Sequence, residues 1–186
     1  MRFSKVNEGP VMDRAADEPF LATTPMVEYD TGKWRMWYSS GLKWLAIGDR
    51  PESVYVVRYA ESTDGIEWHR APAMSIAQKM TDEAQARPWV IQQSDGTRQM
   101  WYSYRGSHDF RSAGASSYRI GYAESADGVT WERLDDHMGL EVSENGWDSE
   151  MTCYPSIYTH SGKLHMLYNG NGFGATGIGY SVYANE

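Results

Sequence analysis

A pattern that recurs about every 65 residues constrains the fold more than any other feature of this chain. Each copy has a Pro followed by one residue and Val or Ile, then a polar turn containing Gly, and it ends in Met-(Trp/Leu)-Tyr-(Ser/Asn). The three prolines are Pro25, Pro88 and Pro155. Self-similarity at a fixed period is typical of chains that stack one supersecondary unit many times, such as solenoids and propellers.

Each unit reads as four antiparallel β-strands. The first two strands are joined by hairpin-turn residues, Thr31-Gly32, Asp95-Gly96 or Ser161-Gly162. A Tyr-Ala-Glu-Ser strand follows in two copies, and a turn at Asp64-Gly65 or Asp127-Gly128 leads to a fourth strand carrying Trp68 or Trp131. Four-stranded units in series predict an all-β fold of about three four-stranded antiparallel β-propeller blades.

We expect one β-propeller-like domain over residues 1–186, with blades at approximately 1–70, 71–133 and 134–186. The third copy, TGIGYSVYANE, stops before any DGxxW turn. A three-blade arc leaves sheet faces and edges open, which favours association. We therefore expect either a partial propeller or one completed in a homo-oligomer, with residues Arg2–Lys5 as one candidate for the missing outer strand.

The composition excludes several classes of partner. A net charge of −8 argues against nucleic acid or an anionic membrane surface. No apolar run is long enough to span a membrane, and the N-terminus has no signal-peptide pattern, so we expect a cytoplasmic protein. Cys153 is the only cysteine, and the repeat aligns it with Thr23 and Ala86, so we expect a small buried side chain.

The motifs resemble a known superfamily. The SxDGxxW turns at Ser62–Trp68 and Ser125–Trp131, the P-x-V/I strands and the MWYS strands resemble the five-bladed propeller glycosidases of glycoside hydrolase families 32, 43, 68 and 130, family 43 most closely. The resemblance implies a carbohydrate partner and three acids at the channel, one of them a general acid. Two departures stand out: there are three blades rather than five, and no innermost strand begins with the Asp-Pro of family 43.

Three carboxylates are candidates for catalysis. Glycoside hydrolysis needs one acid to protonate the leaving oxygen and a second carboxylate opposite. Glu150 lies five residues before Pro155 and is our candidate general acid, with Asp148 as its neighbour. Glu83 has the equivalent place before Pro88. The alternative for each is a solvated loop acid.

Candidate substrate-binding residues lie around the starts of the innermost strands. Arg87 directly precedes Pro88, and its planar guanidinium suits a carboxylate, a phosphate or a sugar hydroxyl. Tyr154 holds the same place before Pro155. The remaining candidates follow the second strands: Tyr104, Arg105, Asn169 and Asn171. We expect no cofactor, and the sequence has no metal-ligand spacing. A calcium ion in the channel is the alternative that stays open.

These observations predict a glycoside hydrolase-like propeller protein that acts on or binds a glycan. The alternatives are a non-catalytic carbohydrate-binding or assembly module, and a fragment of a longer propeller enzyme. The missing Asp-Pro and the small number of blades favour the non-catalytic module.

Overall fold

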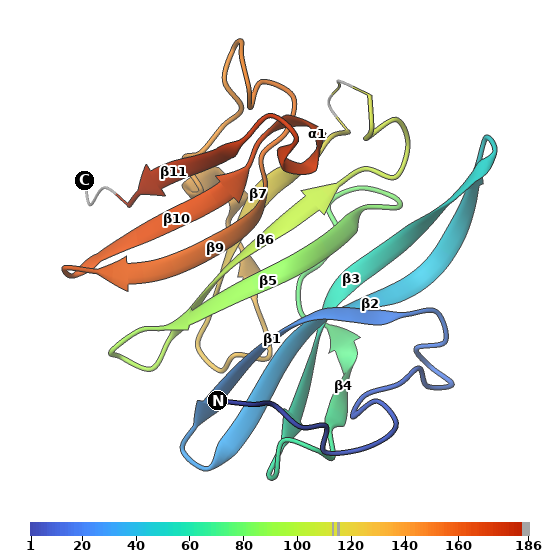
Figure 1. Ribbon diagram of the computed structural model, residues 1–186, viewed down its shortest axis with the longest axis vertical. Coiled ribbons are helices and arrows are strands. Elements are labelled where there is room, and N and C mark those ends of the chain that lie inside the picture. Colours follow the sequence, from blue (N-terminus) through green and yellow to red (C-terminus); the bar gives the residue numbers. More distant parts are fainter. Residues whose placement is uncertain (113, 115, 184–186) are drawn as a thin grey trace.

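The chain folds into three antiparallel sheets that are arranged one after another (Figure 1). The computed structural model describes residues 1–112, 114 and 116–183. The predicted all-β fold of propeller blades is confirmed. The two helices in the described part of the chain are short, the 3-10 helix η1 (Asp135–His137) and α1 (Asn171–Gly174).

Each sheet is a meander, because consecutive strands pair as hairpins. The first sheet has the order β1 (Ala22–Asp30), β2 (Lys33–Ile47), β3 (Arg50–Ser62) and β4 (His69–Met74). The second contains β5 (Ala84–Gln92), β6 (Arg98–Arg105), β7 (Arg119–Ser125) and β8 (Glu132–Arg133). The third contains β9 (Cys153–His160), β10 (Lys163–Asn169) and β11 (Ile178–Val182), one strand fewer among the described residues.

The first strand of every sheet is innermost in the arc. Strands β1, β5 and β9 lie side by side and run in the same direction, and the hairpins that follow them all turn at the same end of the molecule (Figure 1). Their starts therefore meet at the opposite end, beside the loop after β6 and α1. This is the end at which the repeat predicted the candidate site residues.

Adjacent sheets are joined by apolar faces. We call the face that packs on the next sheet the forward face and the opposite one the back face. The forward face of the first sheet packs Trp37, Val57 and Tyr59 on Val90, Met100 and Ala123 of the second sheet's back face. The indole Nε1 of Trp37 also donates to the Gly128 carbonyl at 2.8 Å, which ties the first sheet to the second sheet's DG turn.

The two DG turns have the structure that their sequence predicts. In the second sheet, Asp127 Oδ1 accepts the amides of Val129 and Thr130, both at 2.8 Å. Trp131 folds under the turn, and its Nε1 donates to the Gly128 carbonyl at 3.1 Å. A side-chain acceptor that replaces two backbone partners explains why Asp recurs at this place.

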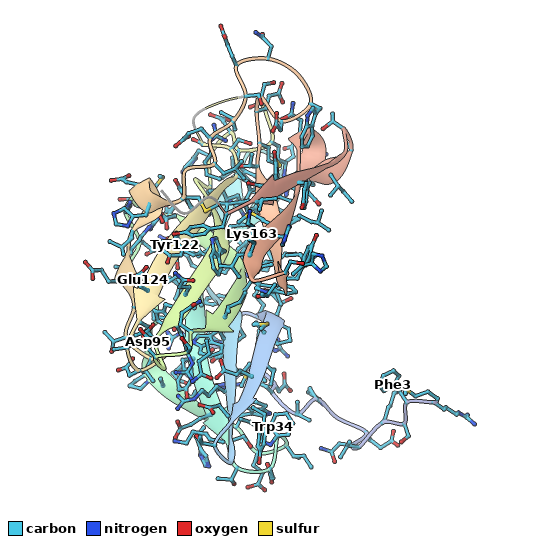
Figure 2. The ribbon with its side chains drawn as sticks, turned by 90° about the vertical axis from the view of Figure 1, so that its left-hand side faces the viewer. Phe3, Trp34, Asp95, Tyr122, Glu124 and Lys163 are labelled. Carbon is cyan, nitrogen blue, oxygen red and sulfur yellow. The ribbon has the colours of Figure 1, made fainter. Side chains whose placement is uncertain are left out.

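The N-terminal segment does not complete the third sheet of this chain. Residues 1–10 form no strand, and Phe3 lies far from the sheets (Figure 2). The prediction that Arg2–Lys5 supply the outer strand within one chain is therefore wrong. The large apolar side chains of this segment, Met1, Phe3 and Val6, are all exposed, so the segment buries little apolar surface against a sheet.

Candidate functional site

A backbone feature repeats where the innermost strands begin. Thr24, Arg87 and Tyr154 each precede the repeat proline and have φ of 49°, 50° and 58°. Residues other than glycine are uncommon in this left-handed region, and holding one there costs about 1–3 kcal/mol. A β-bulge accompanies each one, because the pairing with the second strand shifts there. We call these three positions the channel entrance.

Hydroxyl groups of the neighbouring sheet hold these bulges. The amide of Tyr154 donates to Ser103 Oγ at 2.8 Å. The amide of Arg87 lies 3.4 Å from Thr24 Oγ1, which is itself 2.8 Å from Ser39 Oγ. Ser39 and Ser103 are the repeat-equivalent Ser residues of the MWYS strands, so the same sequence element that forms the second strand also supports the entrance.

Arg87 and Tyr154 form a pair across two sheets. The Arg87 guanidinium carbon lies 4.5 Å from the centre of the Tyr154 ring, within range of a cation–π interaction. Arg87 is exposed, and no described residue forms an ion pair with its guanidinium. The five N–H donors of Arg87 are therefore available to a ligand. The structure brings together two of the predicted binding residues.

An aromatic cluster lies beneath this pair. Its members are Tyr55, Phe110, Tyr118 and Phe173, with the Tyr118 ring 5.6 Å from that of Tyr154. Arg105 lies within the cluster, 3.6 Å from the Phe110 ring centre, and its Nε donates to the Tyr118 hydroxyl at 3.1 Å. Because Arg105 is buried and its donors are used, it holds the floor of the entrance rather than its surface.

Repeat comparison missed this cluster, because Phe110 and Phe173 come from non-equivalent segments, although Tyr55 and Tyr118 hold equivalent positions in the first two repeats. Tyr55 belongs to β3, Phe110 to the loop after β6, and Phe173 to α1. The signal in the sequence is the placement of two of the four Phe residues, one in the loop after β6 and one in α1, both beside the entrance.

Glu150 lies in the loop before β9 with its backbone held on both sides. Its amide donates to Asn171 Oδ1 at 2.8 Å, and its carbonyl accepts from Arg119 Nη1 at 2.9 Å. Its carboxylate is exposed, and among the described residues it has no hydrogen bond or ion pair. Asn171 and Asn169 use their side chains within the same loops, with Asn169 Nδ2 donating to the Phe173 carbonyl at 3.0 Å.

Asp148 is buried and accepts a hydrogen bond from Tyr168 at 3.0 Å. Burial, together with that bond, raises the pKa of Tyr168 to about 12. The same arrangement occurs in the other sheets, where Tyr38 donates to Glu18 and Tyr102 donates to Asp135. A carboxylate under the repeated Tyr is thus a recurrent part of the blade.

Glu83 is fully buried and forms an ion pair with Arg133 of β8 at 2.7 Å. Arg133 also pairs with Asp135 at 2.7 Å and lies 4.8 Å from the ring centre of Tyr104. Glu83 and Tyr104 therefore belong to one buried charged cluster, separate from the contact between Arg87 and Tyr154. Catalysis by Glu83 or Asp148 stays a prediction.

Cys153 is buried beside the aromatic cluster that contains Phe110 and Tyr118, as its repeat position predicts. Burial raises the pKa of its thiol to about 12, against a smaller opposite effect of Arg87. The thiolate is the reactive form, so we expect the native protein to react with a disulfide reagent far more slowly than the urea-unfolded chain. Equal labelling rates, followed by absorbance of the released thiolate, would contradict this burial.

The described residues contain no group of three or more His, Cys, Asp and Glu side chains arranged to hold a metal ion. They also contain no helix that is long and apolar enough to cross a membrane. A hollow of about 770 Å³ lies between the second and third sheets, with Trp101, Leu140 and Met166 among its lining residues. Since these side chains pack the two sheets together, we assign the site to the entrance instead.

Comparison by sequence finds relatives but no family profile. No protein-family profile matches the chain. Two uncharacterized Mycobacterium tuberculosis proteins, Rv1502 (strain H37Rv) and MT1551 (strain CDC 1551), are each 37% identical over 185 residues. The match covers 98% of this chain and 58% of each relative, so the chain spans little more than half of their length.

Solved structures of glycoside hydrolases superpose on almost the whole chain. One glycoside hydrolase has a TM-score of 0.71 at 16% identity and covers 97% of this chain and 52% of its own. The family 117 glycoside hydrolase Zg3597 from Zobellia galactanivorans has a TM-score of 0.70 at 16% identity, covering 92% and 54%. The Bombyx mori family 32 β-fructofuranosidase BmSUC1 has 0.61 at 14%, covering 89% and 34%. This chain has the fold of glycoside hydrolase propellers.

Proposed function

We propose that this protein binds a glycan at the channel entrance. The observation that carries the proposal is the exposed Arg87 guanidinium above the Tyr154 ring, with both residues on left-handed backbone. A half-buried aromatic ring beside free N–H donors offers what a sugar needs, an apolar face and directional hydrogen bonds. The glycoside hydrolase fold supports a carbohydrate as the ligand class.

Binding, rather than hydrolysis, is the function that the geometry favours. Two of the three candidate acids, Glu83 and Asp148, are buried in pairings that hold the sheets, which leaves Glu150 as the one with an exposed carboxylate. Hydrolysis requires a second carboxylate across the scissile bond. A binding module meets the observations without it.

The test is titration calorimetry against neutral and uronic-acid-containing oligosaccharides. We expect Arg87→Gln to weaken binding about tenfold or more, because a hydrogen bond to a charged group contributes about 1.5–3 kcal/mol. Arg14→Gln makes the same change at an exposed arginine of the N-terminal segment and should leave the affinity unchanged. No binding to any sugar, or equal effects of the two substitutions, would contradict the proposal.

Hydrolysis with Glu150 as general acid is the second candidate, favoured by its fixed backbone and free carboxylate. If it operates, Glu150→Gln should lower turnover of a reactive aryl glycoside about 10²–10⁴-fold, the usual contribution of general acid catalysis. Glu144→Gln, at an exposed glutamate of the same loop, serves as the control. Turnover that Glu150→Gln leaves unchanged would remove Glu150 from this role.

A further inference from the structure

The forward face of the third sheet is exposed where its equivalents are buried. In the first sheet, Trp37, Val57 and Tyr59 are 0%, 0% and 3% exposed, and in the second, Trp101, Ile120 and Tyr122 are 5%, 3% and 7% exposed. The repeat-equivalent Leu167, Ile178 and Tyr180 of the third sheet are 39%, 70% and 58% exposed. The forward face is therefore covered by the following sheet in the first and second sheets, and it is open in the third.

The open face has the internal order of a covered one. His165 Nδ1 lies 2.7 Å from the Tyr180 hydroxyl. The equivalent pairs, Arg35 with Tyr59 at 3.0 Å and Gln99 with Tyr122 at 2.6 Å, lie on the two buried forward faces. Tyr158 stacks on His165 with ring centres 5.1 Å apart. Such a surface is preorganised for a partner of the kind that covers its equivalents.

The forward faces of the first and second sheets are each covered by the apolar back face of the next sheet. The back face of the first sheet is partly free. The segment from Met12 to Ala22 packs on Met36 and Tyr38, which covers one end. At the other end, Val27 and Tyr29 are 39% and 59% exposed, although Val90 and Ile157, the equivalents of Val27, are 4% and 3% exposed. The arc therefore ends in two complementary open surfaces.

One contact between the forward face of a sheet and the back face of the next recurs at equivalent positions, and its two sides have matching chemistry in each pair of sheets. Between the first and second sheets, Glu28 and Asp30 form ion pairs with Arg98 at 2.7 and 3.2 Å. Between the second and third sheets, the equivalent residues are the apolar Ile91 and Leu164, which both pack on the same core cluster.

At the two open surfaces the equivalent residues are aromatic. Tyr158 and His160 occupy the forward positions of Glu28 and Asp30, and Trp34 occupies the back position of Arg98. The first pair of sheets joins acids to a base and the second joins two aliphatic side chains. Joining the third sheet to the first would place aromatic rings together, a combination that stabilises interfaces.

We propose that the forward face of β9–β11 binds the back face of β1–β4 of a second copy of this chain. The contact is head-to-tail, so that each copy offers one surface of either kind, and two arcs facing each other form a dimer through two such contacts. In a longer protein, further sheets would cover the same face in cis.

The test is light scattering on a sizing column over a range of concentrations. We expect twice the chain mass for the wild type and a monomer for a variant carrying both Ile178→Glu and Tyr29→Glu. The two single variants should each associate more weakly than the wild type, and mixing them should partly restore the dimer, because each mixed pair keeps one intact contact. Ile66→Glu, in an exposed turn, is the control.

A wild-type monomer at every concentration overturns the proposal. So does a dimer that Ile178→Glu does not weaken. Loss of the dimer with Ile178→Glu but not with Tyr29→Glu overturns it too, because it would mean that the open faces bind each other. Ile178 and Tyr29 are both well exposed, so far-ultraviolet circular dichroism should show that the variants remain folded.

Discussion

Arg133→Met should destabilise the protein by about 3–5 kcal/mol, because it leaves the carboxylate of Glu83 buried without its cation. Met roughly keeps the volume of the side chain, so the loss reports charge rather than packing. The measurement is the free energy of unfolding from a urea titration followed by Trp fluorescence. A loss below about 1 kcal/mol would contradict the assignment of Glu83 to this buried cluster.

Lys33→Met is the matched control. Lys33 and Glu61 also form an ion pair, at 3.0 Å, but both side chains are about two-fifths exposed. Water and salt screen such a pair, so its loss should cost less than about 1 kcal/mol. Adding Glu83→Gln to Arg133→Met should recover part of the stability, because the stranded charge is removed.

Trp37→Ala should cost about 3–5 kcal/mol, the range found when a large buried aromatic side chain is truncated. Trp37 fills the contact between the first and second sheets, and its loss also leaves the Gly128 carbonyl without that indole donor. Urea titration again supplies the measurement. A cost near zero would mean that the two sheets do not depend on this contact.

A substitution at the repeat-equivalent residue of the third sheet is the matched control for Trp37→Ala. Leu167 is equivalent to Trp37 but lies on the open forward face of the third sheet. Leu167→Ala should cost about 1 kcal/mol or less when unfolding is measured at low protein concentration, as for surface substitutions generally. Equal costs for the two substitutions would contradict the difference in burial on which the dimer contact is argued.

The sequence predicted those parts of the fold that depend on local patterns. The repeated Pro and Met-(Trp/Leu)-Tyr motifs and the Gly-containing turns locate the strands, and the repeat shows which of them are equivalent. It also indicated that Cys153 is buried. All of this follows because strands and hairpins are determined by neighbours in the chain.

The partners of the candidate site residues could not be predicted in the same way. Glu83 pairs with Arg133, 50 residues later in the chain, and no local pattern connects the two. Position relative to the proline suggested that Glu83 and Glu150 are alike, yet one is buried and the other exposed. Arg87 and Tyr154 were found because both lie directly before a repeat proline, where the backbone of every copy is the same.

A crystal structure of the protein soaked with oligosaccharides from the calorimetric panel tests the central claim most directly. The account predicts a sugar ring against Tyr154, with its hydroxyl or carboxylate groups hydrogen-bonded to Arg87. Sugar bound elsewhere, for instance in the hollow lined by Trp101 and Met166, would contradict the assignment of the channel entrance as the binding site, as would an entrance that stays empty with every oligosaccharide.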